Sequence, residues 1–208
     1  MSTCIDAFKN LYVEERQTEI YIAPCCLSKT TKLESNLDFV KNSELASIRE
    51  SWTNQKFPHA CQNCNQSEKD NNTSRRIGSN QWYQDHGFFD NTVELIRLDY
   101  WTGDLCNLAC AICGPNNSSV WKEELNLSTD QKKVVVNKFW KNLNLSKLKF
   151  VHFNGGEPLL SKEHLIFLDS IQNKSEVHLN YNTNGTVLPT EHLLNLWQQF
   201  KLVQLEIG

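Results

Sequence analysis

Three cysteines near the middle of the chain, Cys106, Cys110 and Cys113, have a spacing that suits metal chemistry. They form the pattern C-x3-C-x2-C, so their thiolates can wrap one centre. A closed zinc or iron–sulfur site is usually held by four protein ligands. Three ligands leave one coordination position open for a small molecule, and the pattern therefore predicts a reactive centre. Buried thiols, or part of a zinc site, are the alternative interpretation.

The other five cysteines lie nearer the N-terminus and predict a second site. Cys61 and Cys64 form C-x2-C, a spacing with which two thiolates grip one metal. Together with Cys4 and one of the adjacent Cys25 and Cys26, they make four ligands. Adjacent side chains of an extended segment point to opposite faces, so only one of the pair is expected to reach the metal. We favour Cys25, although nothing local decides between the two.

Two histidines, His59 and His86, are alternative ligands for this second site, but we expect ordinary polar roles for both. The first ten residues lack the basic and apolar pattern of a signal peptide, so we expect a cytoplasmic protein. In that reducing compartment disulfides are disfavoured, and metal ligation is the better explanation for eight cysteines.

Length and composition are those of a globular protein. The chain has 208 residues, of which 39% are hydrophobic and 22% charged, enough for one sizeable domain and a small one. The net charge of −3 does not indicate a basic nucleic-acid-binding surface. No apolar run approaches the roughly 18 residues of a membrane span, so no membrane partner is expected.

From about residue 92 onward, strand and helix patterns alternate, which predicts an α/β fold with a parallel sheet or barrel. Helices are predicted where apolar residues recur at helical spacing between the strands. The strand runs are 93–100, 149–153, 177–181 and 202–207, and the helical stripes are 136–143, 165–171 and 193–200. In a βα barrel the loops that follow the strands gather on one rim. The cysteine loop and the turns at 155–158 and 182–185 are therefore expected on the same rim.

The first 85 residues predict a small, irregular, cysteine-rich domain. A hairpin is expected over residues 11–23 and a helix around residues 45–52. The polar stretch from 69 to 81 is interpreted as a linker or exposed loop. Arg75 and Arg76 could bind a phosphate or carboxylate there, but we expect them on a solvated face.

The motifs of the second part resemble those of the radical S-adenosylmethionine superfamily. They are C-x3-C-x2-C, Gly155-Gly156-Glu157-Pro158, Asn182-Thr183-Asn184-Gly185 and the stretch 113–121. The resemblance implies a partial (βα) barrel and a 4Fe–4S cluster on the three cysteines, whose fourth iron chelates S-adenosylmethionine. It also implies that residues 155–158 contact the amino group of S-adenosylmethionine. Ile112 would lie against the adenine, where the family usually has an aromatic residue.

The first part resembles the twitch domain, a half-size relative of SPASM auxiliary-cluster domains. The likeness rests on the order of parts: Cys4, a hairpin leading into Pro24-Cys25-Cys26, a helix ending near Trp52, and then C-x2-C. It implies an auxiliary iron–sulfur cluster, with a four-cysteine zinc knuckle as the alternative. The family usually has a glycine in the hairpin turn, and this chain has none. The predicted domains are 1–85 and 92–208, and the resemblance covers about 1–208.

Taken together, the resemblance implies a radical enzyme that cleaves S-adenosylmethionine and abstracts hydrogen from a substrate, a peptide or protein. An electron donor such as flavodoxin or ferredoxin is implied as a partner. The alternatives are a non-catalytic zinc or iron–sulfur interaction module, an enzyme acting on a nucleotide or sugar, or an inactive fragment. The family barrel usually has six βα units, whereas four strands are predicted here. We therefore expect a truncated chain, or one completed by another polypeptide.

Overall fold

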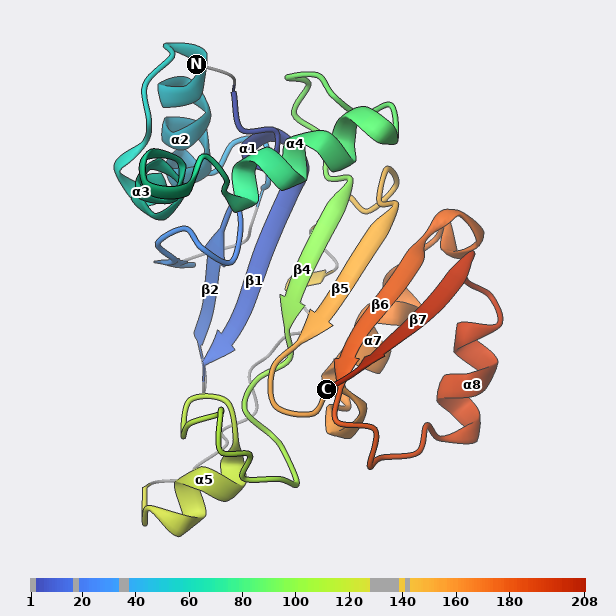
Figure 1. Ribbon diagram of the computed structural model, residues 1–208. Helices are drawn as coiled ribbons and strands as arrows, with labels where there is room; N and C mark the ends of the chain where they lie inside the picture. Colours follow the sequence, from blue (N-terminus) through green and yellow to red (C-terminus); the bar gives the residue numbers. More distant parts are fainter. Residues whose placement is uncertain (1–2, 17–18, 34–37, 128–138, 141–142) are drawn as a thin grey trace.

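The centre of the molecule is one seven-stranded sheet (Figure 1). The computed structural model describes residues 3–16, 19–33, 38–127, 139–140 and 143–208. The strand order is β3-β2-β1-β4-β5-β6-β7. The strands are β1 (Asn10–Arg16), β2 (Glu19–Ala23), β3 (Thr31–Lys32), β4 (Arg97–Trp101), β5 (Phe150–Asn154), β6 (His178–Thr183) and β7 (Leu202–Ile207).

Most of the sheet is parallel, which confirms the predicted α/β class. Strands β1, β4, β5, β6 and β7 run in the same direction, and β2 and β3 are antiparallel additions at one side. Strand β1 pairs directly with β4, in the register Asn10 to Arg97. The sheet therefore contains strands from both segments that the sequence predicts as separate domains, 1–85 and 92–208. The partial barrel of the radical S-adenosylmethionine type remains a prediction.

Helices precede, connect and cover the strands. They are α1 (Asp6–Lys9), α2 (Ser43–Thr53), α3 (Gln62–Asn71), α4 (Arg75–Asp85), α5 (Ser119–Glu124), α7 (Glu163–Ser170) and α8 (Glu191–Trp197), with 3₁₀ turns η1 (His59–Cys61), η2 (Pro158–Leu160) and η3 (Lys174–Glu176). Figure 1 shows α1 to α4 around the starting ends of β1 and β4, with α5 beyond the opposite ends of these strands. In the described residues, no helix is both long and apolar enough to cross a membrane.

The two faces of the sheet differ because side chains alternate along a strand. On one face Leu98, Val151 and Leu179 are completely buried and pack in one cluster with side chains of α7 and α8. On the other face Asp99, His152 and Asn180 lie side by side in register. The apolar face packs against α7 and α8, whereas on the polar face Asp99 is bound by Arg75 of α4.

Most of the predicted elements are confirmed. The hairpin is β1–β2, the early helix is α2, and the four later strands are β4 to β7. Thr190 caps α8 as expected, because its side chain accepts a hydrogen bond from the backbone N–H of Leu193. Of the stripe at 136–143, Val136 lies outside the described residues, while Phe139, Trp140 and Leu143 are buried.

One prediction is wrong: residues 69–81 are not a linker. They belong to the end of α3 and most of α4. Asn72, in the left-handed conformation, ends α3, and the Ser74 side chain caps α4 by accepting from the N–H of Ile77. Residues that looked like loop formers are therefore the caps between two helices. The second cysteine pair also lies on helical turns, with Cys61 ending η1 and Cys64 in the first turn of α3.

Candidate metal centres

The cysteines gather at opposite ends of the sheet. Cys25 follows β2, whose last residue Ala23 pairs with Tyr12 near the start of β1. Cys106 follows the far end of β4, which runs parallel to β1 (Figure 1). Since β4 alone spans about 17 Å at about 3.3 Å per residue, the two groups of thiols are well separated. We call them the N-terminal cavity and the rim site.

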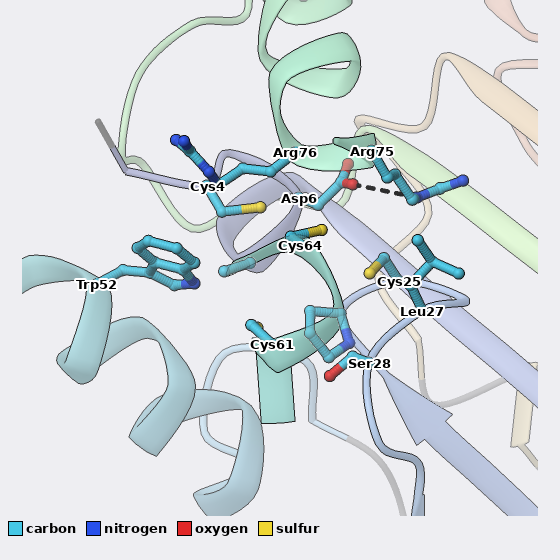
Figure 2. Close-up of a pocket in the computed structure, with 12 residues that line it drawn as sticks. Cys4, Asp6, Cys25, Leu27, Ser28, Trp52, Cys61, Cys64, Arg75 and Arg76 are labelled. Atoms are coloured by element: carbon cyan, nitrogen blue, oxygen red, sulfur yellow. Dashed lines mark ion pairs between the residues drawn. The ribbon is translucent and has the colours of Figure 1, made fainter. Parts of the chain in front are cut away.

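Four cysteines from three segments line the N-terminal cavity (Figure 2). Cys4 precedes α1, Cys25 follows β2, and Cys61 and Cys64 come from η1 and α3. All four are buried, with between 7% and 9% of their surface exposed. Cys26, by contrast, is exposed. Of the adjacent pair, the structure therefore turns Cys25 inward and Cys26 outward.

Burial makes the positions of Cys4, Cys25 and Cys61 unfavourable for a free thiolate. Burial raises the pKa of Cys4 well above its ordinary value, and Asp6, Cys25 and Cys61 add to this effect. Burial likewise raises the pKa of Cys25, and it raises that of Cys61 to about 11. The four thiols share this environment because they line the same cavity. A bound metal cation would favour the thiolate over the thiol, because metal ligation requires the thiolate.

Two arginines bring positive charge to the wall of this cavity. Arg76 is 6% exposed and forms an ion pair with Glu68, with Nη2 and Oε2 2.6 Å apart. Arg75 donates from Nη2 to Asp99 Oδ2 at 2.6 Å and lies 3.6 Å from Asp6. The expectation of a solvated face for this pair is therefore wrong. Both arginines are ordered by buried or half-buried carboxylates, which keeps their charge beside the sulfurs.

The rim site is open to solvent. Cys106 is half-buried, while Cys110 and Cys113 are exposed and Ile112 is 97% exposed. The N–H of Cys113 donates to the carbonyl of Cys110 at 2.9 Å, which closes a turn. Partial burial raises the pKa of Cys113, and the neighbouring Cys110 and Cys106 raise it further. The three thiols thus lie on one loop that a ligand can reach.

Side chains of the following segment hold the cysteine loop in shape. Ser119 Oγ donates to the carbonyl of Cys106, and Ser118 Oγ donates to the carbonyl of Leu108. Trp121 Nε1 donates to the carbonyl of Cys110 at 2.9 Å. The start of α5 therefore acts as a frame for the loop.

The Gly155-Gly156 turn is built against this loop. The N–H of Gly156 donates to the carbonyl of Gly103 at 2.9 Å, and the N–H of Glu157 donates to that of Leu105 at 2.7 Å. A Cβ on Gly156 would lie 2.3 Å from the Leu105 oxygen, and one on Gly155 would lie 2.6 Å from the Gly103 oxygen. Glycine is therefore required here for the close approach of two loops.

Glu157 connects the rim turns to each other. It is completely buried, and its carboxylate accepts from the Thr183 hydroxyl at 2.8 Å and from the N–H of Asn184 at 2.8 Å. It also caps η2 by accepting from the N–H of Leu159, next to buried Pro158. The resemblance suggests that this carboxylate lies near the amine of a ligand. In the structure it faces Thr183 and Asn184 instead. Its negative charge is used to join the turn after β5 to the turn after β6.

The asparagines of the second turn lie at the surface of the rim. Asn182 Nδ2 donates to Asn154 Oδ1 at 2.7 Å. Asn184 Nδ2 donates to Asn107 Oδ1 at 3.0 Å and lies 3.9 Å from Cys106 Sγ. The structure therefore brings residues 106–113, 155–158 and 182–184 together at one edge, as parallel topology predicts.

Residues 95–203, slightly more than half of the chain, match the family described as 4Fe–4S single cluster domain. This span contains Cys106, Cys110 and Cys113. The chain belongs to that 4Fe–4S single cluster domain family. A 4Fe–4S cluster is thus the cofactor that the family supports. Neither the curated proteins nor the solved structures contain a match to this chain.

The N-terminal cavity lies outside the part that matches the 4Fe–4S single cluster domain. The argument for a metal centre there therefore depends on the residues of the cavity itself. Its donor set fits a metal centre, because four thiols meet there beside two cations. In the described residues, however, no three His, Cys, Asp or Glu side chains already stand in positions that would hold one metal ion. His86 is stacked on Trp82, with ring centroids 4.1 Å apart, and takes no part in the cavity.

The sequence gives no sign that Trp52 and Ser28 belong to the cavity. Trp52 marks only the end of a predicted helix, and Ser28 is part of no motif. Both line the cavity and are buried. No spacing pattern marks them, since Trp52 has the periodicity of a core residue and Ser28 follows the cysteine pair at a turn that side-chain types alone do not specify.

Proposed function

We propose that this chain is a radical S-adenosylmethionine enzyme, with the rim site as its reactive centre. Cys106, Cys110 and Cys113 would hold a 4Fe–4S cluster and leave its fourth iron to S-adenosylmethionine. When bound, the cluster supplies the electron that splits the sulfonium of S-adenosylmethionine into methionine and a 5′-deoxyadenosyl radical, which then takes hydrogen from a substrate. The protein's contribution is binding, orientation and exclusion of water.

The observation that carries this proposal is the joining of the rim turns. The backbone N–H groups of Gly156 and Glu157 donate to the loop that leads into Cys106, so the two candidate binding elements have a fixed relation. The Glu157 carboxylate joins these elements to the turn after β6, because it accepts hydrogen bonds from the Thr183 hydroxyl and the Asn184 N–H. In this proposal Glu157 is a positioning residue. The open carbonyls of the turn, rather than the carboxylate, would accept from the amine of S-adenosylmethionine.

The exposure of the rim supports a role for the residues around the cluster. Ile112, at 97% exposure, offers apolar surface that the adenine ring can cover. Cys110 and Cys113 are also exposed, which would let an electron donor such as flavodoxin or ferredoxin approach closely. The polar sheet face with Asp99, His152 and Asn180 leads away from the rim and offers hydrogen-bonding groups to a substrate. A peptide or protein substrate rests on the resemblance alone.

For the N-terminal cavity we propose an auxiliary iron–sulfur cluster held by Cys4, Cys25, Cys61 and Cys64. Four buried thiolates would close the coordination sphere, so its role would be electron transfer or structure rather than substrate binding. Cys26, being exposed, would not take part.

The test is iron counting combined with ligand binding on the full chain after anaerobic reconstitution. Replacing Cys106, Cys110 and Cys113 together by Ala should lower iron from about eight to about four per chain. Calorimetry should show that S-adenosylmethionine binds the parent and not the triple variant. Cys26→Ala is the control and should keep both properties. Unchanged iron in the triple variant would rule out the rim cluster.

The alternative is a non-catalytic zinc or iron–sulfur interaction module. The four buried cysteines of the N-terminal cavity favour it, because closed tetrahedral cysteine sites are typical of structural zinc. The two functions differ in metal content. A colourless protein that purifies with zinc and fails to take up iron would support the module and contradict the radical enzyme.

A further inference from the structure

Two hydrogen-bond donors in the N-terminal cavity lack a partner. Trp52 is 2% exposed and Ser28 is 7% exposed, and both line the cavity with the cysteines. Among the described residues, neither Trp52 Nε1 nor Ser28 Oγ makes a hydrogen bond. A buried donor left unpaired costs roughly 1–3 kcal/mol, and a buried indole N–H usually finds an acceptor. Two such donors in one small cavity therefore indicate that an acceptor belongs there.

The surroundings keep both donors facing the sulfurs. The Trp52 ring packs edge-on against Phe57 with centroids 4.7 Å apart, and the Arg76 guanidinium lies 5.8 Å from its centroid. Figure 2 shows the indole nitrogen on the side of the ring that faces the cysteines. The N–H of Ser28 donates to the carbonyl of Cys25 at 3.1 Å, so a turn fixes this serine beside a candidate ligand.

The candidate acceptor for both donors is the sulfur of Cys61. Trp52 and Cys61 pack in the same cluster of buried side chains. The N–H of Lys29, next to Ser28, donates to the carbonyl of Ala60, next to Cys61, at 3.2 Å. Neither donor makes a hydrogen bond to this sulfur among the described residues. A thiol is a weak acceptor, whereas a thiolate carries a full negative charge and attracts such donors strongly.

We propose that Trp52 and Ser28 donate hydrogen bonds to the Cys61 thiolate when the N-terminal cavity holds its cluster, and that they raise its reduction potential. The inference rests on the proposed auxiliary cluster and deepens it. Hydrogen bonds to ligand sulfurs are one of the factors that set iron–sulfur potentials. Reduction adds negative charge to the cluster and its thiolates, so donors stabilise the reduced form more than the oxidised one. Both are positioning residues, and the cavity is then tuned for electron transfer.

The experiment uses the full chain in which Cys106, Cys110 and Cys113 are replaced by Ala, so that only the N-terminal cluster contributes a signal. Trp52→Phe keeps an aromatic ring and removes the N–H. Trp82→Phe is the matched control, because Trp82 lies on α4 and stacks on His86 away from the cavity. The midpoint potential is measured by a redox titration followed by electron paramagnetic resonance.

Trp52→Phe should disfavour one-electron reduction by up to about tenfold, which corresponds to a midpoint potential about 59 mV lower. Ser28→Ala should shift the potential in the same direction by a smaller amount, and Trp82→Phe should leave it unchanged. If Trp52→Phe does not fold, Ser28→Ala alone decides by the same criterion.

Equal potentials in the parent, Trp52→Phe and Ser28→Ala would overturn the inference while the cluster itself remained established. A triple-cysteine background that takes up zinc and no iron would instead refute the proposed auxiliary cluster. The two failures are therefore distinguishable from the metal content alone.

Discussion

The two groups of cysteines differ most clearly in their exposure to solvent. In the N-terminal cavity four thiols are at most 9% exposed, and their burial raises the pKa of at least three of them. At the rim, two of three thiols are exposed. A buried set of four can complete the coordination of a metal by itself, whereas an exposed set of three leaves room for a substrate. Cysteines at the two ends of one sheet are thus suited to two different roles, a closed metal site and an open one.

The two groups also differ in what holds them. The N-terminal cavity is bounded by side-chain ion pairs, such as Arg76 with Glu68 and Arg75 with Asp99. The rim is held by backbone hydrogen bonds between turns that Gly155 and Gly156 allow to approach closely, and by side-chain hydrogen bonds such as those of Ser119 and Trp121. Substitutions of charged side chains should therefore affect the first region more, and added side-chain volume should affect the second.

The largest expected difference is in thiol reactivity without metal. The thiolate is the nucleophile, and the Cys61 pKa of about 11 compares with about 8.5 for an ordinary cysteine. Cys61 therefore stays protonated at pH 8 and gains reactivity only as the pH approaches 11. Because Cys110 is exposed and Cys61 is buried, we expect iodoacetamide to alkylate Cys110 at least about tenfold faster than Cys61. Peptide mass spectrometry of the metal-free protein measures both rates.

The adjacent cysteines supply an internal control for this measurement. Cys26 is exposed and Cys25 is buried, although they share a local sequence. Cys26 should react faster than Cys25 in the folded protein, and the two should become similar in denaturant. Equal rates for the four cavity cysteines and the rim cysteines in the folded protein would show that the contrast between the two regions is wrong.

The second prediction concerns the ion pair beside the cavity. Arg76→Ala leaves the Glu68 carboxylate without its closest cation and removes a guanidinium that lies over the Trp52 and Phe57 rings. Breaking a buried ion pair in this way is strongly destabilising, and we expect the free energy of unfolding to fall by about 3 kcal/mol. Urea denaturation followed by circular dichroism measures the loss.

Arg16→Ala is the matched control, because Arg16 pairs with Glu14 at the same 2.6 Å separation but is 49% exposed. Exposed pairs contribute only about 0–1 kcal/mol. If the two variants lose the same stability, the cavity does not depend on buried charge. Iron bound at the rim should be the same in both variants.

Much of this fold followed from the sequence because local patterns determine it. The apolar runs at 150–154 and 178–183 became strands, and parallel topology then placed the cysteine loop and the turns at 155–158 and 182–185 on one edge. That a turn rich in glycine was needed was also predictable. What the glycines contact was not, since both a ligand and a neighbouring backbone favour the same residue.

The errors concern polar residues that tertiary contacts bury. Arg76 and Glu68 lie eight positions apart, and only the packing of α3 against α4 turns them into an ion pair. Glu157 looked like a ligand-binding carboxylate, yet its partners Thr183 and Asn184 come from a different βα unit. Periodicity reports which side of an element faces the core. It does not report which polar side chains meet there.

The smallest predicted effect concerns Asn184, which joins the turn after β6 to the cysteine loop. Its Nδ2 donates to Asn107 Oδ1 at 3.0 Å and lies 3.9 Å from Cys106 Sγ, while its Oδ1 accepts from the Thr186 hydroxyl. Asn184→Ala leaves all three rim cysteines in place, so iron content after reconstitution should be unchanged. The loop would, however, lose one hydrogen bond, whose net contribution to stability is typically about 1 kcal/mol.

We therefore expect a chelator to remove the rim iron from Asn184→Ala roughly five-fold faster than from the parent, since about 1 kcal/mol corresponds to that factor. Loss of the iron absorbance near 400 nm follows the rate, in a background where Cys61→Ala and Cys64→Ala remove the N-terminal signal. Asn195→Ala, on the exposed side of α8, is the control and should match the parent. Equal rates for all three proteins would mean that the turn after β6 does not support the cysteine loop. The cysteine loop would then be held by the turn at Gly155 and Gly156 and by the start of α5.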